Sequence, residues 1–370
     1  MMKIKVEKAS LIQVLQKVQS ITDKKTSMPV LSNTLIKATD QNKIEFSATD
    51  LDLSVWTQIE AEVEAPGGTT VSAKKLLEIV RELPLDRVAL EMIPVNQLHI
   101  EAGRAHFQLA TIPPEDFPHM NFYQGATLGP CDISVLKKSI AKTIHGVPME
   151  DDPFSIAGLF LHTAESGELR FVSSDGHRLA YYEIPRSAFP DLDIGNGIII
   201  PRKGAQEILK ILEKETEASV GIHENCLILS TPETLLSVQL LEAEFPEYQL
   251  IIPEDRPFSF TVEWESIHSA LKRVAILTNQ KWRHVRFVIT SGTLELEAGN
   301  PEVGNATETL DIDYQGEPFT IAFNIRYVQD TVQATESSHV RFEWVDQYHG
   351  GVILGTDDPG YLSLIMPMVV

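Results

Sequence analysis

The alternation of apolar and polar residues predicts a strand at three evenly spaced places along the chain. Residues 43–50, 168–175 and 293–300 begin at intervals of 125 residues. Each segment follows an Asn or Gly suited to a turn, alternates apolar with other side chains, and ends in Asp or Asn. Because successive side chains of a strand point to opposite faces, this pattern is typical of a strand that enters a turn.

Apolar residues at helical spacing recur with the same period. Residues three or four apart lie on one face of a helix, so each set predicts an amphipathic helix. The first set is Leu11, Leu15 and Val18, the second is Ile133, Leu136, Ile140 and Ile144, and the third is Ile267, Leu271 and Val274.

A short apolar strand that leads into a second helix is the third recurring element. We expect Ser72 and Asn324 to act as helix N-caps, and Pro201 to occupy a first helical turn. The strands are residues 69–72, 198–201 and 320–324, and the helices are residues 74–83, 202–212 and 325–332.

Three element types that recur in one order predict three homologous domains. We place these domains at residues 1–125, 126–253 and 254–370. Each repeat is long enough to bury a core of its own, unlike a solenoid unit. The predicted fold class is α+β, with two helices on one face of antiparallel strands in each domain.

Composition narrows the class of protein. The 370 residues include 43% hydrophobic residues, yet no apolar run is long enough to span a bilayer and the first residues do not resemble a signal peptide. Cys131 and Cys226 are too few for a disulfide framework. These features favour a protein of the reducing cytoplasm.

The formal net charge of −21 argues against nucleic acid as a partner only if the charge is evenly spread. The expected helices carry many cations, whereas much of the acid falls in expected strands and loops. Lys and Arg are also good helix formers on solvated faces, which explains any single helix. Six helices with this bias favour a surface that contacts phosphates weakly. The cations are Lys74, Lys75, Arg81, Lys137, Lys138, Lys142, Arg202, Lys203, Lys210, Lys214, Lys272 and Arg273.

Enzyme interpretations find little support in the motifs. Asp175 and His177 could suggest a hydrolase, but residues two apart rarely form a catalytic pair, and a turn at Gly176 explains the segment better. His145, His162 and His177 lack the spacing of metal ligands. We therefore expect no catalytic residue, metal ion or cofactor.

Several segments together resemble the beta subunit of bacterial DNA polymerase III, the sliding clamp family, from end to end. The most specific are Ser-Asp-Gly-His-Arg-Leu-Ala at 174–180 and Met-Pro-Met at 366–368. The others are residues 28–33, 48–51, 113–118, 201–204 and 245–248.

The resemblance implies a head-to-tail homodimer in which six domains close a ring around duplex DNA, with twelve helices lining the hole. Such a ring is a processivity factor without chemistry of its own, and its partners are the replicative polymerase, the clamp loader and repair proteins. The dimer contact would join Phe107 and Leu109 to Ile276 and Leu277 of the other subunit.

The resemblance also implies a pocket for partner peptides between the second and third domains. Methionine suits a pocket that accepts varied ligands. Leu250, Val369 and Val370 depart from the family pattern and make the pocket more apolar. The implied residues are Ile156, Ser174, Gly176, His177, Arg178, Leu179, Pro246, Leu250, Ile251, Leu364, Met366, Pro367 and Met368.

For DNA, the resemblance points to a basic loop and to cations on helices. Residues 151–155 depart from members that present tyrosines to DNA. The candidates are Lys24, Lys25, Arg81, Arg202, Lys203, Lys281 and Arg283. Two other hypotheses stand beside the clamp: an acidic docking scaffold that does not encircle DNA, and a hydrolase using Asp175 and His177.

Overall fold

The computed structural model describes residues 2–22, 28–120, 126–149, 156–279 and 283–368. The chain forms two compact units. Unit 1 consists of Met1–Ile133, Phe189–Asp193 and Lys203–Leu240, and unit 2 consists of Ser134–Ala188, Ile194–Arg202 and Leu241–Val370. Among the described residues, no helix is both long and apolar enough to cross a membrane.

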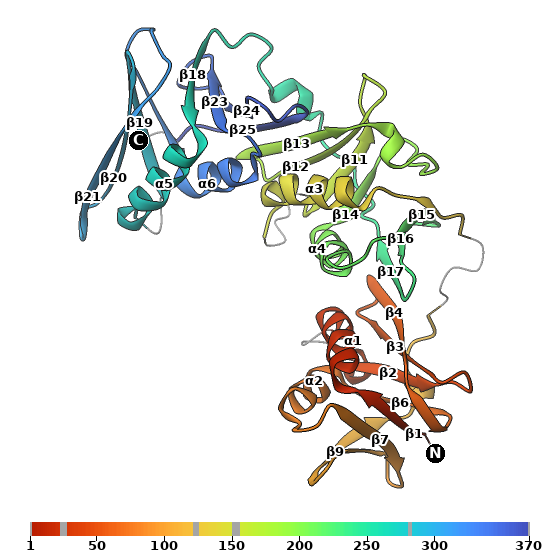
Figure 1. Cartoon of the computed structure of the whole chain (residues 1–370). Coiled ribbons are helices and arrows are strands. Elements are labelled where there is room, and N and C mark those ends of the chain that lie inside the picture. The colour runs from red at the N-terminus through yellow and green to blue at the C-terminus, as the bar shows by residue number, and fades with distance from the viewer. Residues whose placement is uncertain (1, 23–27, 121–125, 150–155, 280–282, 369–370) are drawn as a thin grey trace. The chain divides into compact units, whose positions relative to one another are not determined.

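Unit 1 is built on a sheet of 13 strands, with α1 (Lys8–Ile21) and α2 (Ala73–Glu82) packed against each other (Figure 1). From Lys203 onward, α4 (Arg202–Ile211) also belongs to this unit. The strands, in sheet order, are β10 (Gly129–Pro130), β15 (Ser219–His223), β16 (Cys226–Ser230), β17 (Thr234–Gln239), β4 (Leu53–Glu60), β3 (Lys43–Thr49), β2 (Asn33–Ala38), β6 (Gly67–Ser72), β9 (Ala105–Ile112), β8 (Gln97–Ala102), β7 (Arg87–Ile93), β1 (Lys3–Glu7) and β5 (Glu62–Ala65).

Unit 2 contains two sheets and three helices, α3 (Ile133–Thr143, from Ser134 onward), α5 (Trp264–Val274) and α6 (Ile325–Ala334). The sheet of eight strands has the order β14 (Ile198–Pro201), β11 (Gly158–Thr163), β12 (Leu169–Ser174), β13 (Arg178–Ile184), β25 (Tyr361–Ile365), β24 (Gly351–Gly355), β23 (His339–Trp344) and β18 (Phe258–Glu263). The sheet of four strands has the order β21 (Gly304–Asp311), β20 (Thr293–Asn300), β19 (His284–Thr290) and β22 (Phe319–Asn324).

Short 3-10 helices connect these elements. They are η1 (Pro29–Ser32), η2 (Pro114–Asp116), η3 (Ile144–Gly146), η4 (Arg186–Ala188), η5 (Tyr248–Ile251) and η6 (Ala275–Leu277).

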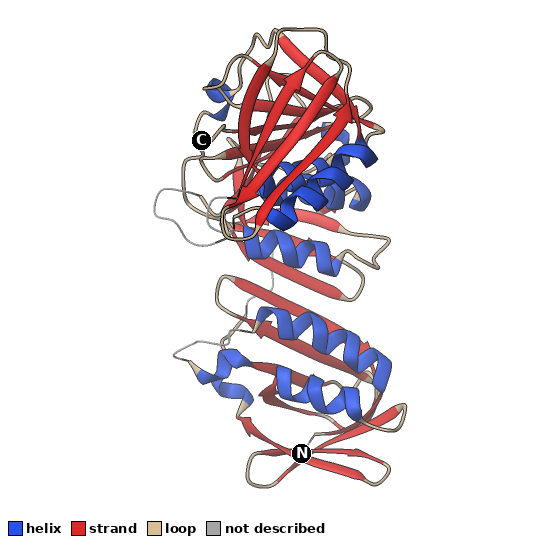
Figure 2. Cartoon of the chain, turned by 90° about the vertical axis from the view of Figure 1, so that its left-hand side faces the viewer, coloured by secondary structure: helices blue, strands red, loops and turns tan. Residues whose placement is uncertain are grey.

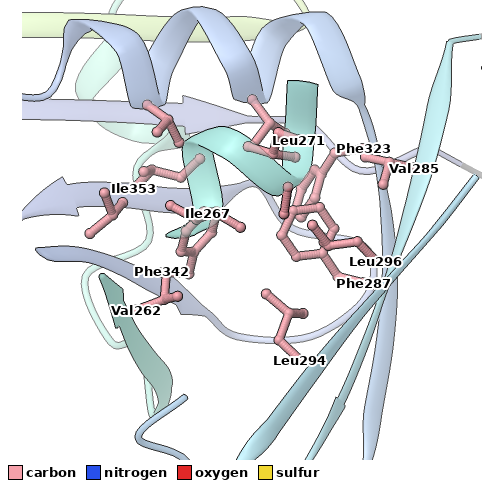
Figure 3. Packing of buried hydrophobic residues seen from close by; sticks show 14 of the residues in the cluster. Val262, Ile267, Leu271, Val285, Phe287, Leu294, Leu296, Phe323, Phe342 and Ile353 are labelled. Atoms are coloured by element: carbon pink, nitrogen blue, oxygen red, sulfur yellow. The ribbon is translucent and has the colours of Figure 1, made fainter. Parts of the chain in front are cut away.

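In the core of the third repeat, the apolar face of a helix packs against the apolar faces of strands. Ile267 and Leu271, four apart on α5, point toward Phe287, Leu296 and other apolar side chains of the strands (Figure 3). The four named side chains are at most 1% exposed. Burial of this apolar surface holds the helices against the sheets.

The order of elements repeats three times. A strand and a helix are followed by strands, a second helix and three more strands, and in the part of the chain that the structure describes only the first repeat has the additional β5. Every ladder between named strands of the described chain is antiparallel. In Figure 2, helices of the chain lie against faces of its sheets. The predicted α+β class with helices on antiparallel sheets is confirmed.

Consecutive repeats are joined by one kind of strand pairing. The fourth strand of the first repeat, β4, pairs antiparallel with β17, the last strand of the second. The fourth strand of the second repeat, β13, pairs in the same way with β25, the last strand of the third. The central repeat therefore contributes strands to both large sheets, which explains why the compact units divide it.

Most local predictions are confirmed, but several helix ends differ from the expected ones by one or two residues. The Lys75 amide donates to Ser72 Oγ at 3.4 Å, and the Arg326 amide donates to Asn324 Oδ1 at 3.0 Å, so both N-caps form. Pro201 ends a strand instead of starting a helix, because it pairs with Gly158 in the β11–β14 ladder. The second helix ends at Thr143, and Ile144 begins η3.

Candidate functional site

The expected basic face of α3 does not include Lys142, and this prediction is wrong. Lys142 is 2% exposed, forms an ion pair with Asp358, and donates to the Ala334 carbonyl at 3.0 Å. Burial lowers the pKa of Lys142, while the Asp358 carboxylate opposes that shift. The side chain therefore connects α3 to the loop before β25. It is too deeply buried to contact a phosphate group.

Several other helix cations are paired with acids, so acid and base are less separated than the sequence suggested. Glu207 of α4 is 3% exposed and accepts from Ser20 Oγ at 2.6 Å. Ion pairs of helix cations include Lys210–Glu207 at 2.5 Å, Lys138–Glu336 at 2.6 Å, Arg273–Glu308 at 2.5 Å and Lys75–Glu78 at 2.8 Å. Exposed pairs of this kind contribute little to stability, but they reduce the positive field of the helices.

The candidate DNA contacts in unit 1 are Arg81 and Lys203. Arg81 is exposed in the last turn of α2. Lys203 lies in the first turn of α4, where Nζ pairs with the Asp50 carboxylate and donates to the Ile21 carbonyl at 3.3 Å. Lys24 and Lys25 lie outside the described residues.

In unit 2, the candidates Arg202 and Arg283 are held by backbone groups. Arg202 Nη1 donates to the Ile144 carbonyl at 2.8 Å and to the Val147 carbonyl, and burial lowers the pKa of its guanidinium. Arg283 has a φ of 46°, and its carbonyl accepts from the Ile325 amide at 2.8 Å. Lys281 lies outside the described residues.

Several of the expected peptide-site residues lie on or next to the ladder between β13 and β25 in unit 2, two strands that are labelled in Figure 1. Leu179 and Leu364 lie opposite each other and are completely buried. They pack with Tyr248 of η5, which brings the following residues of η5 beside the two strands. Leu250, Ile251 and Met366 are 79%, 50% and 38% exposed. The arrangement is a buried apolar floor with exposed apolar residues around it.

The turn before β13 connects to the C-terminal segment. The Asp175 carboxylate accepts from the amides of His177 and Arg178, each at 3.0 Å, and from Arg178 Nε. Gly176 has a φ of 81°, which glycine adopts without strain. The Met366 amide donates to the His177 carbonyl at 2.8 Å. Asp175 therefore orders this turn and does not orient the exposed His177 ring for catalysis.

The other expected peptide-site residues have identifiable positions. Ser174 Oγ donates to the Arg178 carbonyl at 3.0 Å, and the Pro246 carbonyl accepts from the Tyr248 amide at 2.7 Å. Ile156, Pro367 and Met368 are half-buried. Val369 and Val370 lie outside the described residues.

The sequence prediction missed the polar network around Tyr248. Its hydroxyl lies 2.9 Å from His162 Nε2 and accepts from Arg170 Nη1 at 3.0 Å, and Arg170 pairs with Glu183. Burial raises the pKa of Tyr248, and the Arg170 guanidinium opposes this shift. The sequence feature that could have indicated this network is the Phe-Pro-Glu-Tyr segment at 245–248, but its tyrosine was assigned no role.

The expected dimer residues lie on two elements with open sides. Phe107 and Leu109 occupy one face of β9, where Phe107 is 40% exposed. The β8 ladder covers Ala105 to Ala110 of β9, whereas the β6 ladder covers only Thr111 and Ile112. Ile276, 77% exposed, and Leu277 lie in η6, which contacts the edge strand β21.

Three copies of one α+β unit, with exposed apolar residues on strands and short helices, define a multidomain protein built from a repeated domain. Its parts match three family models: the N-terminal domain of the DNA polymerase III beta subunit at residues 2–121, the central domain at 131–247, and the C-terminal domain at 249–369. The chain belongs to the DNA polymerase III beta subunit family.

Relatives agree with this assignment over the whole chain. The chain is 32% identical over 376 residues to the beta sliding clamp of Caulobacter vibrioides, with both sequences fully covered. It is 30% identical over 371 residues to the beta sliding clamp of Vibrio cholerae, covering 99% of this chain and 100% of the relative.

Solved structures agree as well. The crystal structure of the C. crescentus beta sliding clamp has a TM-score of 0.91 and 32% identity, covering 100% of this chain and 99% of that one. The DNA polymerase III subunit beta from Pseudomonas aeruginosa has a TM-score of 0.88 and 28% identity, with both chains fully covered. The chain is therefore a DNA sliding clamp in function, a non-enzymatic processivity factor, and the hydrolase hypothesis is set aside.

Proposed function

We propose that two copies of this chain join head to tail into a ring that encloses duplex DNA and tethers the replicative polymerase. The observation that supports this most strongly is the strand pairing repeated within the chain. The fourth strand of one repeat pairs with the last strand of the next at both internal joints. By the same rule, β21 of one chain pairs antiparallel with β9 of the other.

The edges of β21 and β9, the two strands that this rule leaves without a partner inside the chain, support the proposed pairing between chains. Within the described parts of the chain, β21 is the edge strand of its sheet, and Ala105 to Ala110 of β9 pair only with β8. An exposed strand edge is a template for pairing with another chain. Phe107 and Leu109 on β9 would meet Ile276 and Leu277 beside β21, so apolar burial would add to the ladder. Because the two surfaces differ, the contact is heterologous and closes a ring only through rotation.

Enclosure makes strong DNA contacts unnecessary. A closed ring cannot leave a duplex sideways, so it holds the polymerase at a high effective concentration near the primer end. Weak phosphate contacts then suffice, in keeping with a net charge of −21 and with cations that are already paired. The proposed contacts are Lys24, Lys25, Arg81, Arg202, Lys203, Lys281 and Arg283.

Partner proteins would dock at the β13–β25 surface. The exposed side chains of Leu250, Ile251 and Met366 suit a short apolar peptide that lies over the buried floor of Leu179 and Leu364. The polymerase, the clamp loader and repair proteins would use this one site and compete for it. The remaining proposed residues are Ile156, Ser174, Gly176, His177, Arg178, Pro246, Pro367 and Met368.

Domain limits and location complete the proposal. We assign the domains to residues 1–125, 126–253 and 254–370, and the protein to the bacterial cytoplasm, at the nucleoid during replication. The acidic scaffold that does not encircle DNA remains the competing hypothesis, and retention on circular DNA separates the two.

A mixing experiment tests the head-to-tail contact. Phe107→Asp and Ile276→Asp each place a charge in the proposed joint, so each variant alone should be monomeric in sedimentation equilibrium. Mixed together, they share one intact joint, formed by Ile276 of the first variant and Phe107 of the second, and should form an open dimer. Tyr348→Asp, an exposed loop position at 71% exposure, should leave the closed dimer unchanged.

Two results of the mixing experiment would contradict the proposed contact. If the mixture remains as monomeric as the separate variants, or if either variant alone dimerises like the wild type, the proposed joint is wrong.

A further inference from the structure

We propose that His99, Glu101 and His106 form a zinc-binding site on the outer face of the β8–β9 hairpin. His99 and Glu101 are two residues apart on β8, so their side chains leave the strand on one face. Glu101 lies directly opposite His106 of β9 in the ladder. Leu98, Ile100 and Ala102 alternate with them and are buried on the other face.

The distances fit chelation after a small adjustment. Glu101 Oε2 lies 3.7 Å from His99 Nε2 and 3.9 Å from His106 Nδ1. One ligand atom from each residue lies within 4.8 Å of the others. Tetrahedral zinc with bonds of about 2.0–2.1 Å keeps its ligand atoms roughly 3.3 Å apart. Exposed His106 and Glu101 can rotate by this amount without disturbing the core.

The two rings are already held near each other. The imidazoles of His99 and His106 stack with centroids 5.5 Å apart and planes 17° from parallel. They sit on adjacent strands of a hairpin whose ladder runs from Gln97–Ala110 to Ala102–Ala105. The backbone positions of all three ligands are thus fixed by strand pairing before a metal ion arrives, which limits the entropy lost on binding.

The donor set selects the class of metal ion. Two imidazole nitrogens and one carboxylate oxygen are ligands that zinc accepts, with a water molecule completing the tetrahedron. Magnesium and calcium prefer sites made of oxygen alone. Because all three ligands belong to one chain, we expect one zinc ion per chain.

The test is a calorimetric titration of the untagged, full-length protein with zinc chloride. The wild type should bind one zinc ion per chain and gain thermal stability, whereas magnesium chloride should do neither. His99→Ala and His106→Ala should each weaken zinc binding by about tenfold or more, because each removes a direct ligand. Glu101→Gln should also weaken it, since a neutral amide is the poorer ligand.

A matched control separates chelation from surface binding. His349 is an exposed histidine 2.9 Å from a carboxylate oxygen of Asp346, so it offers one imidazole and one acid. His349→Ala should leave stoichiometry and affinity unchanged. Failure of the wild type to bind one zinc ion per chain, or unchanged affinity in a folded His99→Ala/His106→Ala variant, would overturn the proposal. Circular dichroism establishes the folded state of each variant.

Discussion

Lys142 and Asp358 form a buried ion pair between α3 and the loop before β25. Each side chain is 2% exposed, and Asp358 also accepts from the Glu336 amide at 3.1 Å. A buried charge that loses its partner keeps its desolvation cost without the compensating attraction. The pair therefore matters more to the joint between the second and third repeats than the exposed pairs on the helices.

Asp358→Ala should lower the free energy of unfolding by about 3–5 kcal/mol, because it leaves Lys142 buried without its carboxylate. Asp357→Ala is the matched control, since Asp357 is the neighbouring, exposed acid. Urea unfolding followed by circular dichroism measures both. Equal effects of the two substitutions would contradict the assigned role of the pair.

The buried imidazole of His145 makes the free energy of unfolding depend on pH. Burial, followed by the charges of Arg178 and Arg202, lowers the pKa of His145 from 6.5 to about 3. Between these values the unfolded chain binds a proton that the folded chain does not. This contribution to stability is present above pH 6.5 and decreases by up to about 1.4 kcal/mol per pH unit as the pH falls toward 3.

His145→Gln should therefore flatten the decline of unfolding free energy below pH 6.5, measured by urea unfolding across the range. His349→Gln, at an exposed position, should keep the wild-type slope. A His145→Gln variant whose pH dependence matches the wild type would show that His145 does not carry this effect.

Single residues were predictable from the sequence where their partners are local. Ser72 and Asn324 cap helices that begin one residue later, so each signal lies within one turn. Lys142 was assigned to a solvated face because its partner lies 216 residues further along the chain. Its burial depends on how the repeats pack, which a local pattern does not contain.

Strands and helices were predicted well because their periods reflect burial. Residues 43–49, 169–174 and 293–300 all form strands, and the three apolar helix faces are α1, α3 and α5. Ends were less predictable where tertiary contacts decide them: Pro201 remains in a strand because β14 pairs with β11. The sequence analysis did not group His99, Glu101 and His106, because His106 lies on the neighbouring strand and only the β8–β9 ladder brings it opposite Glu101.

The surface around η5 and β25 should bind partner peptides through apolar contacts. Ile251→Ala should weaken the binding of a peptide from the replicative polymerase by about tenfold or more, since burying such a side chain contributes roughly 1.5–3 kcal/mol to binding. The loss should be similar for a clamp-loader peptide, and each peptide should displace the other in fluorescence anisotropy. Tyr348→Ala should bind as the wild type does. Binding of both peptides to Ile251→Ala at wild-type affinity would argue against this surface.

At the scale of the whole molecule, one joint used repeatedly explains the architecture. The chain contains two copies of the pairing between a fourth and a last strand; among the described residues, β21 has a free edge and Ala105 to Ala110 of β9 pair only with β8. The sequence predicted the triplication but not this pairing, because strand order between repeats is set by tertiary contacts. The proposed ring needs no new type of contact.

The central claim is that the protein stays on DNA by enclosing it. The measurement is retention on nicked circular DNA after loading by a clamp loader with ATP, first at raised salt and then after the circle is cut. Enclosure predicts retention at high salt and release on linearisation, because only a free end lets a closed ring leave. Release at high salt from the uncut circle, after loading at low salt, would mean electrostatic binding alone and would contradict the account.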